Sequence, residues 1–346
     1  MIGEPWPEAD ALFHRDPRFL GSDDAYSVPL GDDRTLWLFG DTFVGDGQQM
    51  DRRKSHFIRN SIGIQTGPDP SNANVDFFWR NDPSPDSFFT TKQGEWLWPL
   101  HGARIADTLL LFFMQVRGPH GGVEEGSDPI DDWRDEGALS FFDVYDWEAF
   151  VIANPDDPPS KWDIQQAKRP KNPRGLVAGA TLLPAEDHLL GYAWKGEDLF
   201  LSRWVASEAA SGDLRKTEWW TPGGWTLDSN DASPIADEAK TEFTVHRDPA
   251  KGKLCMVQMR ALIGAHITVR WADEPHGPWS ELEKIYEPAE AEMPGVMTYA
   301  AKAHPQLTGA DLVLTYASNG SDADSTLDNL DIYFPRFVKV SFEEST

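Results

Sequence analysis

Cysteine is almost absent from this chain, because Cys255 is the only one among 346 residues. A single cysteine excludes an intramolecular disulfide and the zinc sites built from paired cysteines, so the fold must depend on its apolar core. Cys255 lies inside an apolar stretch, which is typical of a buried thiol and not of a nucleophile.

Several motifs of common function classes are missing as well. The sequence has no Gly-rich phosphate loop ending in Lys-Ser or Lys-Thr, no His-Glu-x-x-His motif and no Gly-x-Ser-x-Gly elbow. No apolar run approaches the length of a membrane span, and the first residues lack the basic and apolar regions of a signal peptide. We therefore expect a soluble protein with no membrane partner, secreted or periplasmic if a signal peptide was removed and otherwise cytoplasmic.

Basic residues are also scarce. There are 31 Lys and Arg against 57 Asp and Glu, which gives a formal net charge of -26. A field of this sign repels phosphate, so nucleic acid and anionic membranes are excluded as partners and neutral substrates are favoured. The same acidity equally fits a protein selected for high solubility or a salty environment.

Aromatic and turn-forming residues are abundant, with 15 Trp, 19 Phe, 26 Pro and 28 Gly. This composition favours many short strands, and no long helical period interrupts it. A unit of two apolar strands around a Gly/Asp turn, followed by a further strand, recurs five times at a spacing of about 50 to 70 residues. The pattern predicts an all-β, single-domain, five-bladed β-propeller, with blades at roughly 21–80, 95–150, 173–210, 238–285 and 296–342.

The first unit contains an acidic hairpin. Its turn is predicted at residues 31–34, and counting outward places Asp23 and Asp24 roughly opposite Thr42 and Asp41. Like charges that face each other across a ladder are destabilising, and neighbouring carboxylates push their pKa values apart. We therefore interpret this acidic edge as part of a functional site, although carboxylates in a solvated turn are common.

A propeller brings the ends of its inner strands together at one face, where a sugar-binding funnel is expected. Glycoside hydrolysis needs two carboxyl groups. Asp23 and Glu242 supply such a pair from different blades. We expect Asp23 to be the base or nucleophile, Glu242 the general acid and Asp41 the carboxylate that tunes the acid. The expected substrate-binding residues are Asp24, Arg59, Asn60, Trp98, His101, Trp194, Arg260, Tyr299, Lys302, His304 and Asn319.

Two of these residues have structural alternatives. Glu242 could be a strand-edge residue paired with Lys240 or Arg260, and His304 could be a hydrogen-bonded core histidine on the axis. No cofactor is expected to be required and no metal ligands are assigned. A calcium ion at the axis, held by carboxylates and carbonyls, is compatible with the sequence.

Several segments carry a family resemblance: DDAYSVPLGDDRTLWLFGDTF, RNSIGI, HITVRWADEPHGPW, and YAAKAHPQL with LTYASN. They resemble five-bladed propeller glycoside hydrolases of the arabinanase and β-xylosidase type, and a bacterial group labelled as a domain of unknown function that includes endo-D-arabinanases. The resemblance implies that Asp23 is the catalytic Asp, Glu242 the general acid and His304 the axial His. It also implies a tuning Asp in a middle blade, but GLVAGATLL has no acid there. Relatives tend to have Gly where this chain has Asp24, which leaves open whether Asp23 or Asp24 faces the substrate.

These observations lead to one expected function and one alternative. The expected function is a glycoside hydrolase that acts on an arabinan-like or related glycan by carboxylate acid/base catalysis in an axial funnel. The alternative is a non-catalytic carbohydrate-binding or scaffold propeller, which the missing middle-blade acid favours. Fold alone decides neither. The partner is a carbohydrate in both cases, and the sequence gives no indication of the oligomeric state.

Overall fold

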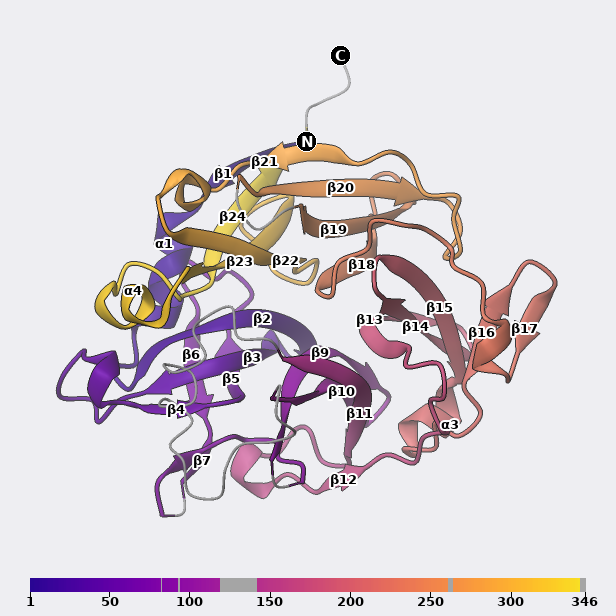
Figure 1. Ribbon diagram of the computed structural model, residues 1–346, viewed down its shortest axis with the longest axis horizontal. Helices are drawn as coiled ribbons and strands as arrows, with labels where there is room; N and C mark the ends of the chain where they lie inside the picture. Colours follow the sequence, from indigo (N-terminus) through magenta and orange to yellow (C-terminus); the bar gives the residue numbers. More distant parts are fainter. Residues whose placement is uncertain (82, 93, 119–141, 261–263, 343–346) are drawn as a thin grey trace.

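The computed structural model describes residues 1–346 except 82, 93, 119–141, 261–263 and 343–346. Five antiparallel sheets of four or five strands follow one another in chain order around a central axis (Figure 1). Neighbouring inner strands contact each other around the ring, in the order β2, β9, β13, β18 and β22, and β22 again meets β2. The prediction of an all-β, single-domain, five-bladed propeller is therefore confirmed.

The first blade surrounds the predicted acidic hairpin. Its strands are β2 (Phe19–Gly31), β3 (Arg34–Val44), β5 (Ser61–Thr66) and β6 (Asn74–Phe78), with β4 (His56–Ile58) paired to the end of β3. A short separate ribbon of β7 (Arg80–Asn81) and β8 (Pro85–Asp86) follows.

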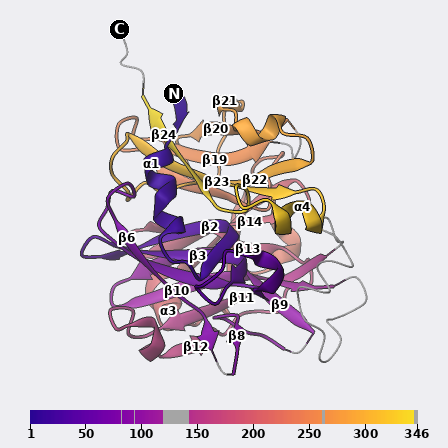
Figure 2. The same ribbon diagram turned by 90° about the vertical axis from the view of Figure 1, so that its left-hand side faces the viewer.

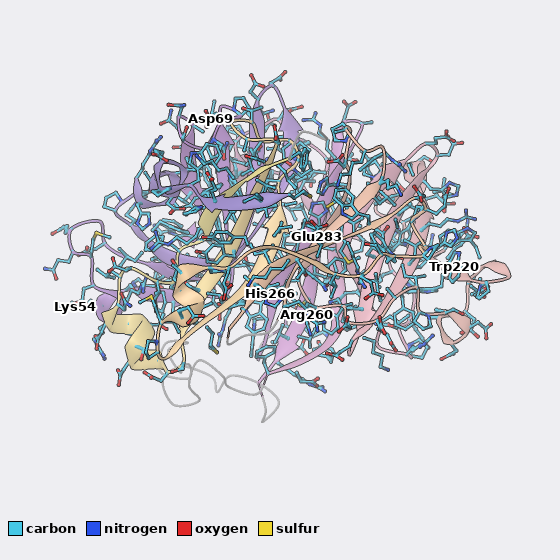
Figure 3. The ribbon with its side chains drawn as sticks, turned by 90° about the horizontal axis from the view of Figure 1, so that it is seen from above. Lys54, Asp69, Trp220, Arg260, His266 and Glu283 are labelled. Atoms are coloured by element: carbon cyan, nitrogen blue, oxygen red, sulfur yellow. The ribbon has the colours of Figure 1, made fainter. Side chains whose placement is uncertain are left out.

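The second and third blades have outer strands beyond residues 150 and 210, where the sequence pattern was weak. The second blade consists of β9 (Glu95–Ile105), β10 (Thr108–Arg117), β11 (Asp143–Ile152) and β12 (Ile164–Gln166). The third consists of β13 (Val177–Ala185), β14 (His188–Lys195), β15 (Asp198–Val205), β16 (Glu218–Thr221) and β17 (Gly224–Thr226). The β16–β17 hairpin projects at the edge of the molecule, where Trp220 stacks on His276 of the fourth blade (Figure 3).

The fifth blade joins the two ends of the described chain. The fourth blade contains β18 (Phe243–Arg247), β19 (Leu254–Arg260), β20 (His266–Ala272) and β21 (Glu283–Tyr286), and the fifth contains β22 (Val296–Ala303), β23 (Leu312–Gly320) and β24 (Arg336–Ser341). The outermost strand of the fifth blade is β1 (Ile2–Pro5), which pairs antiparallel with β24 (Figure 2). The ring is thus closed by pairing the beginning of the chain with its last strand.

Short helical turns connect the strands. They are α1 (Pro7–Asp10), α3 (Ala206–Ala210), α4 (Ala323–Asp328), and the 3-10 turns η1 (Ala11–His14), η2 (Arg52–Lys54), η3 (Pro159–Lys161), η4 (Ser229–Asp231) and η5 (Ala289–Glu292). In the described part of the chain, no helix has the length and apolar character needed to span a membrane.

Aromatic and aliphatic side chains fill the spaces between blades. Where the fifth blade meets the first, Phe13 makes edge-on contacts with Trp37 and Phe39 at centroid distances of 5.1 and 5.3 Å and stacks on Phe337. Such aromatic pairs stabilise beyond the area that they bury. The abundant aromatic residues therefore act mainly as packing between sheets.

Candidate active site

A cavity of about 490 Å³ opens at one end of the inner strands. Residues from all five blades or their connecting segments reach it, although the innermost strand of the third blade, β13, does not contribute to its wall. The lining residues are Asp23, Asp24, Gly40, Asp41, Arg59, Trp96, Trp98, Met114, Phe142, Val144, Gly196, Glu197, Ala239, Lys240, Thr241, Glu242, Met259, Met297, Tyr299, Ala300, Asn319 and Tyr333.

The acidic hairpin is irregular where it reaches this cavity. Its turn is as predicted, because Gly31 pairs with Arg34. The expected register further along is wrong, since Ser22 pairs with Thr42 and Asp24 pairs with Phe39. Bulges interrupt the ladder on both sides of Asp24, whose φ is 73°, and such bulges re-aim side chains. Counting residues along a regular strand could not predict this change.

The irregular backbone lets the two neighbouring acids make different contacts. Asp23 and Asp24 both line the cavity. Asp23 accepts a hydrogen bond at Oδ2 from the Tyr299 hydroxyl at 2.9 Å. Asp24 is buried and its Oδ1 forms an ion pair with Lys302. Of the two, only Asp24 forms an ion pair with a residue in the described part of the chain.

Several charges act on Asp23. Burial raises its pKa well above the usual value, and the carboxylates of Asp41 and Glu242 raise it further. The Tyr299 hydrogen bond and the ammonium of Lys302 act in the opposite direction. Asp23 therefore has the environment of a carboxyl group that keeps its proton to higher pH than an exposed aspartate does.

Asp41 is held by two donors. Trp98 donates its indole N–H to Oδ1 at 2.7 Å, and Arg59 donates to Oδ2 at 3.2 Å. Burial raises the pKa of Asp41 overall, although Arg59 and Trp98 act in the opposite direction. The Arg59 guanidinium also stacks over Trp96 at 4.4 Å from the ring centroid, so Asp41 is fixed from two sides.

A buried ammonium group lies behind the acidic wall. Lys302 has no exposed surface, and its Nζ contacts both Asp24 and, at 3.3 Å, Glu242 Oε1. The same Nζ donates to the Ala300 carbonyl and lies 4.3 Å from the Tyr26 ring centroid. Burial lowers the pKa of Lys302, but Asp24 and Glu242 outweigh this effect and the pKa is raised overall. Lys302 is thus a charged anchor for two acids of the cavity.

The other wall of the cavity is apolar. Trp98 packs edge-on against Trp96 and Phe142, with centroid distances of 5.9 and 4.5 Å. Met114 and Met259 add flexible, polarizable surface. Aromatic faces beside carboxylates and amides form an environment that suits a sugar ring.

The structure brings most of the expected site residues together. Eight line the cavity: Asp23, Asp24, Asp41, Arg59, Trp98, Glu242, Tyr299 and Asn319. Lys302 lies directly behind it, where full burial and two acidic partners make it an internal anchor and not a substrate contact. The alternative pairing of Glu242 with Lys240 or Arg260 is wrong, because Lys240 pairs with Glu197 and Arg260 pairs with Glu238.

Besides Lys302, five expected substrate contacts do not line the cavity. Asn60 is buried and bonds to the backbones of Phe89 and Leu97. The remaining four are His101, Trp194, Arg260 and His304. His101 lies on the inner strand β9 and His304 directly follows the inner strand β22, whereas Trp194 and Arg260 lie on the second strands β14 and β19 of their blades.

Two of these four are histidines near the axis. His304 Nδ1 lies 2.6 Å from Ser27 Oγ and its Nε2 lies 2.7 Å from Thr315 Oγ1, and burial lowers its pKa well below the usual value. His101 accepts the Leu182 amide N–H at 3.0 Å, and burial lowers its pKa to about 4. Both have the surroundings of neutral core histidines.

The other two lie on the third and fourth blades. Trp194 is buried in the core that joins the second, third and fourth blades. Arg260 is paired across the ladder with His266 and forms its ion pair with Glu238 (Figure 3). Neither therefore extends to the cavity wall.

Other lining residues were not expected from the sequence. Tyr333 follows the last helix and has a φ of 66°, and Glu197 lies in the turn between β14 and β15. No motif marks either position. Trp96, by contrast, could have been found from the alternation in Glu-Trp-Leu-Trp, because Trp96 and Trp98 lie on the same face of one strand.

No metal site is evident among the described residues, where no group of three or more His, Cys, Asp and Glu side chains could hold an ion. The axial region contains Lys302 and the two neutral histidines. A calcium ion at the axis stays a prediction.

Comparison with protein families gives a clear result. A family model described as a domain of unknown function (DUF5005) matches residues 8–342. The chain belongs to this family. No curated protein matches it.

Solved structures resemble the DUF5005 chain over nearly its whole length. A protein from Bacteroides ovatus ATCC 8483, provisionally described as a hydrolase, has a TM-score of 0.74 and 18% identity over 97% of this chain and 89% of its own. A GH43 β-xylosidase/α-arabinofuranosidase from a compost microbial metagenome, solved with xylotriose, has a TM-score of 0.52 and 12% identity, covering 94% and 92%. The catalytic domain of a Coprinopsis cinerea GH62 α-L-arabinofuranosidase has a TM-score of 0.50 and 10% identity, covering 93% and 90%. At these identities the likeness shows that the fold is one used by glycoside hydrolases.

Proposed function

We propose that this protein hydrolyses glycosidic bonds of an arabinan-like or related neutral glycan in the cavity at the end of the propeller axis. The observation that carries the proposal is the placement of Asp23 and Asp41 in the wall of one cavity, with unequal partners. Glycoside hydrolysis requires one carboxyl group that holds a proton and one that is ionised. Environments that separate the pKa values of two acids identify these roles.

In this proposal Asp23 is the acid. It forms no ion pair with a described residue, and burial and neighbouring carboxylates raise its pKa. It gives its proton to the leaving oxygen as the bond from that oxygen to the anomeric carbon breaks. Asp41, fixed by Arg59 and Trp98, assists the attack on that carbon, either as base toward water or as nucleophile.

This assignment differs from the one expected from the sequence, in which Glu242 was the acid and Asp23 the base or nucleophile. Glu242 Oε1 lies 3.3 Å from the buried ammonium of Lys302. An acid must hold a proton, whereas an adjacent ammonium attracts a carboxylate. We therefore give Glu242 a supporting role, as a charge that acts on Asp23.

The charges in the cavity favour a neutral substrate. Among the residues that the structure describes, the two cations that line it are already engaged, Arg59 by Asp41 and Lys240 by Glu197. The remaining lining charges are carboxylates, which repel uronic acids and phosphorylated sugars. An arabinan-like substrate is favoured by the family resemblance and by arabinofuranosidases among proteins of the same fold.

The alternative is a propeller that binds glycans without cleaving them. It is favoured by one observation: no acid of β13 lines the cavity, where the related hydrolases are expected to have a tuning Asp. If the protein is an enzyme, Asp41 has to replace this missing Asp by acting together with Asp23.

The experiment compares Asp23→Asn, Asp41→Asn and Glu242→Gln with the wild type on arabinans, xylans and aryl glycosides. We expect Asp23→Asn and Asp41→Asn to lower kcat on natural glycans roughly 10²- to 10⁴-fold, the usual contribution of acid–base groups. An aryl glycoside with a very acidic leaving group needs no protonation. Only the variant that lacks the acid should therefore recover activity on it, and we expect this of Asp23→Asn.

Each other result has a defined meaning. Recovery in Glu242→Gln instead of Asp23→Asn would return the acid role to Glu242. Full activity in both aspartate variants would refute the catalytic site. A wild type that cleaves no substrate in the panel but quenches its tryptophan fluorescence with arabinan oligosaccharides would favour the binding protein.

A further inference from the structure

Arg52 is a fully buried arginine that makes its hydrogen bonds to backbone carbonyls. It lies in η2, in the segment marked by Lys54 in Figure 3, and has no exposed surface. Its Nε donates to the Leu20 carbonyl at 2.7 Å. Its terminal nitrogens donate to the carbonyls of Thr326, Asn329 and Ile332 at 2.6, 2.8 and 2.7 Å. One side chain thus joins β2 of the first blade to the segment between β23 and β24 of the fifth.

Only an arginine can stay charged when buried and bind all four of these carbonyls. Burial lowers the pKa of Arg52 to about 10, so the group stays charged at neutral pH. In the described part of the chain no carboxylate forms an ion pair with it, and its guanidinium instead lies over the rings of Phe43, Tyr333 and Phe334. A planar fork with five donors can satisfy four carbonyls in fixed directions, which a lysine ammonium with three donors cannot do.

The segment held by Arg52 forms part of the cavity wall. Ile332, whose carbonyl it binds, precedes the lining residue Tyr333. Thr326, whose carbonyl it also binds, donates its hydroxyl to Oδ1 of the lining residue Asn319 at 2.5 Å. Arg52 therefore reaches Asn319 through Thr326, and it reaches Tyr333 both directly, over its ring, and through the Ile332 carbonyl, without itself lining the cavity.

The same connection extends to the acid. The Tyr333 carbonyl accepts the amide N–H of Ser22 at 2.8 Å, and Ser22 directly precedes Asp23. A Cβ on Gly21 would lie 2.4 Å from the Tyr333 carbonyl oxygen and 2.8 Å from Arg52, and Gly21 has a φ of 127°. Glycine is thus required here because the two backbones approach closely at a conformation that other residues rarely adopt.

We infer that Arg52 is a positioning residue that sets substrate affinity by holding Tyr333 and Asn319 in the cavity wall. The inference rests on the proposed function for its kinetic consequences. Arg52 does not itself line the cavity and forms no ion pair with Asp23, Asp41 or Glu242, so its loss should loosen the wall residues Tyr333 and Asn319 and leave the chemical groups in place.

Neighbouring Arg53 provides a matched control. It belongs to the same η2 turn and also contacts α4, but through exposed ion pairs with Asp324 and Asp328. Exposed ion pairs contribute little. Arg53→Lys should therefore behave like the wild type, whereas Arg52→Lys should raise KM about tenfold on the best substrate of the panel with kcat changed less than about threefold, the pattern of lost binding without lost chemistry.

Hydrogen exchange measures the same effect without a substrate. In Arg52→Lys, peptides that contain Ser22 and Tyr333 should exchange faster, while those of β13 and β14 should match the wild type. If Arg52→Lys does not fold, Thr326→Val serves instead. It keeps the carbonyl that Arg52 binds and removes the hydroxyl that donates to Asn319 and accepts the Gly320 amide N–H, and it should raise KM in the same way.

The outcomes separate this inference from the proposed function. A KM equal to that of Arg53→Lys, or exchange at Ser22 and Tyr333 that does not change, overturns the role of Arg52. If Thr326→Val is the variant used, an unchanged KM in that variant also overturns the role of Arg52. If the wild type cleaves nothing, the proposed function fails, and the exchange experiment still decides whether Arg52 holds the wall.

Discussion

At the scale of single residues, Asp23 combines a useful chemical property with a cost in stability. It is a half-buried carboxyl group beside other carboxylates, and its pKa is raised well above the usual value by burial first and by Asp41 and Glu242 next. A raised pKa means that the folded protein keeps a proton that the unfolded chain releases more easily. Stability should therefore fall as pH rises from the unfolded pKa of about 4 to the raised folded pKa.

Replacing Asp23 by asparagine should therefore stabilise the protein at neutral pH. We expect the Tm of Asp23→Asn to exceed that of the wild type at pH 8 and the difference to shrink as pH falls toward 4. Thermal unfolding across this range measures it. Asp46→Asn is the control, because hydrogen bonds from Gln48 and Gln49 lower the pKa of this exposed carboxylate and give the opposite sign. A Tm difference independent of pH would contradict the raised pKa of Asp23.

The sequence identified the acids but not their surroundings. Residue type and position near a strand end are enough to select Asp23, Asp41 and Glu242 as candidates. Lys302 has the same kind of position, yet full burial makes it an anchor for Asp24 and Glu242. Burial of a long side chain depends on how neighbouring blades pack, and this information is not local in the sequence.

At the scale of elements, the apolar alternation of the inner hairpins was strong enough to predict all five repeats. The short outer strands β12, β16 and β17 have three or four residues each and carry little pattern. Counting residues outward from the turn also cannot predict the bulges around Asp24. These bulges depend on positive φ angles at Asp24 and Ala25, which non-glycine residues rarely adopt. These bulges decide which acid faces Tyr299 and which faces Lys302.

The close approach of β3 to β2 gives a test of this geometry. A Cβ on Gly40 would lie 2.4 Å from Asp23 Oδ1, whereas its next contacts, at 3.5 Å, are ordinary. Gly40→Ala should therefore displace the Asp23 carboxyl group and lower kcat roughly 100-fold, within the range of acid–base contributions, with little change in Tm. Gly223→Ala, whose Cβ would meet Thr221 at 3.7 Å, is the control. Kinetics and thermal unfolding of both variants measure it, and full activity in Gly40→Ala would show that Asp23 does not need this position.

At the scale of the whole molecule, the ring is closed by a strand from the beginning of the chain. The four residues of β1 pair with β24, and Gly3 packs so tightly against the fourth blade that a Cβ would lie 2.8 Å from Tyr286 Cβ. The inner strands that carry the cavity lie at the opposite edge of the sheet from β1. Ring closure and chemistry therefore depend on different parts of the fifth blade.

Deleting residues 1–5 should separate these two contributions. With four ladder pairs lost at about 0.5–1.5 kcal/mol net for each hydrogen bond, we expect the free energy of unfolding to fall by about 2–6 kcal/mol. Unfolding should keep a single transition, because the five blades pack around one ring, and kcat at 25 °C should stay within about twofold of the wild type. Glu4→Gln is the control, since it removes only a 3.9 Å exposed ion pair with Lys339. An unchanged Tm, or activity lost without a lower Tm, would mean that β1 does not close the ring as its pairing indicates.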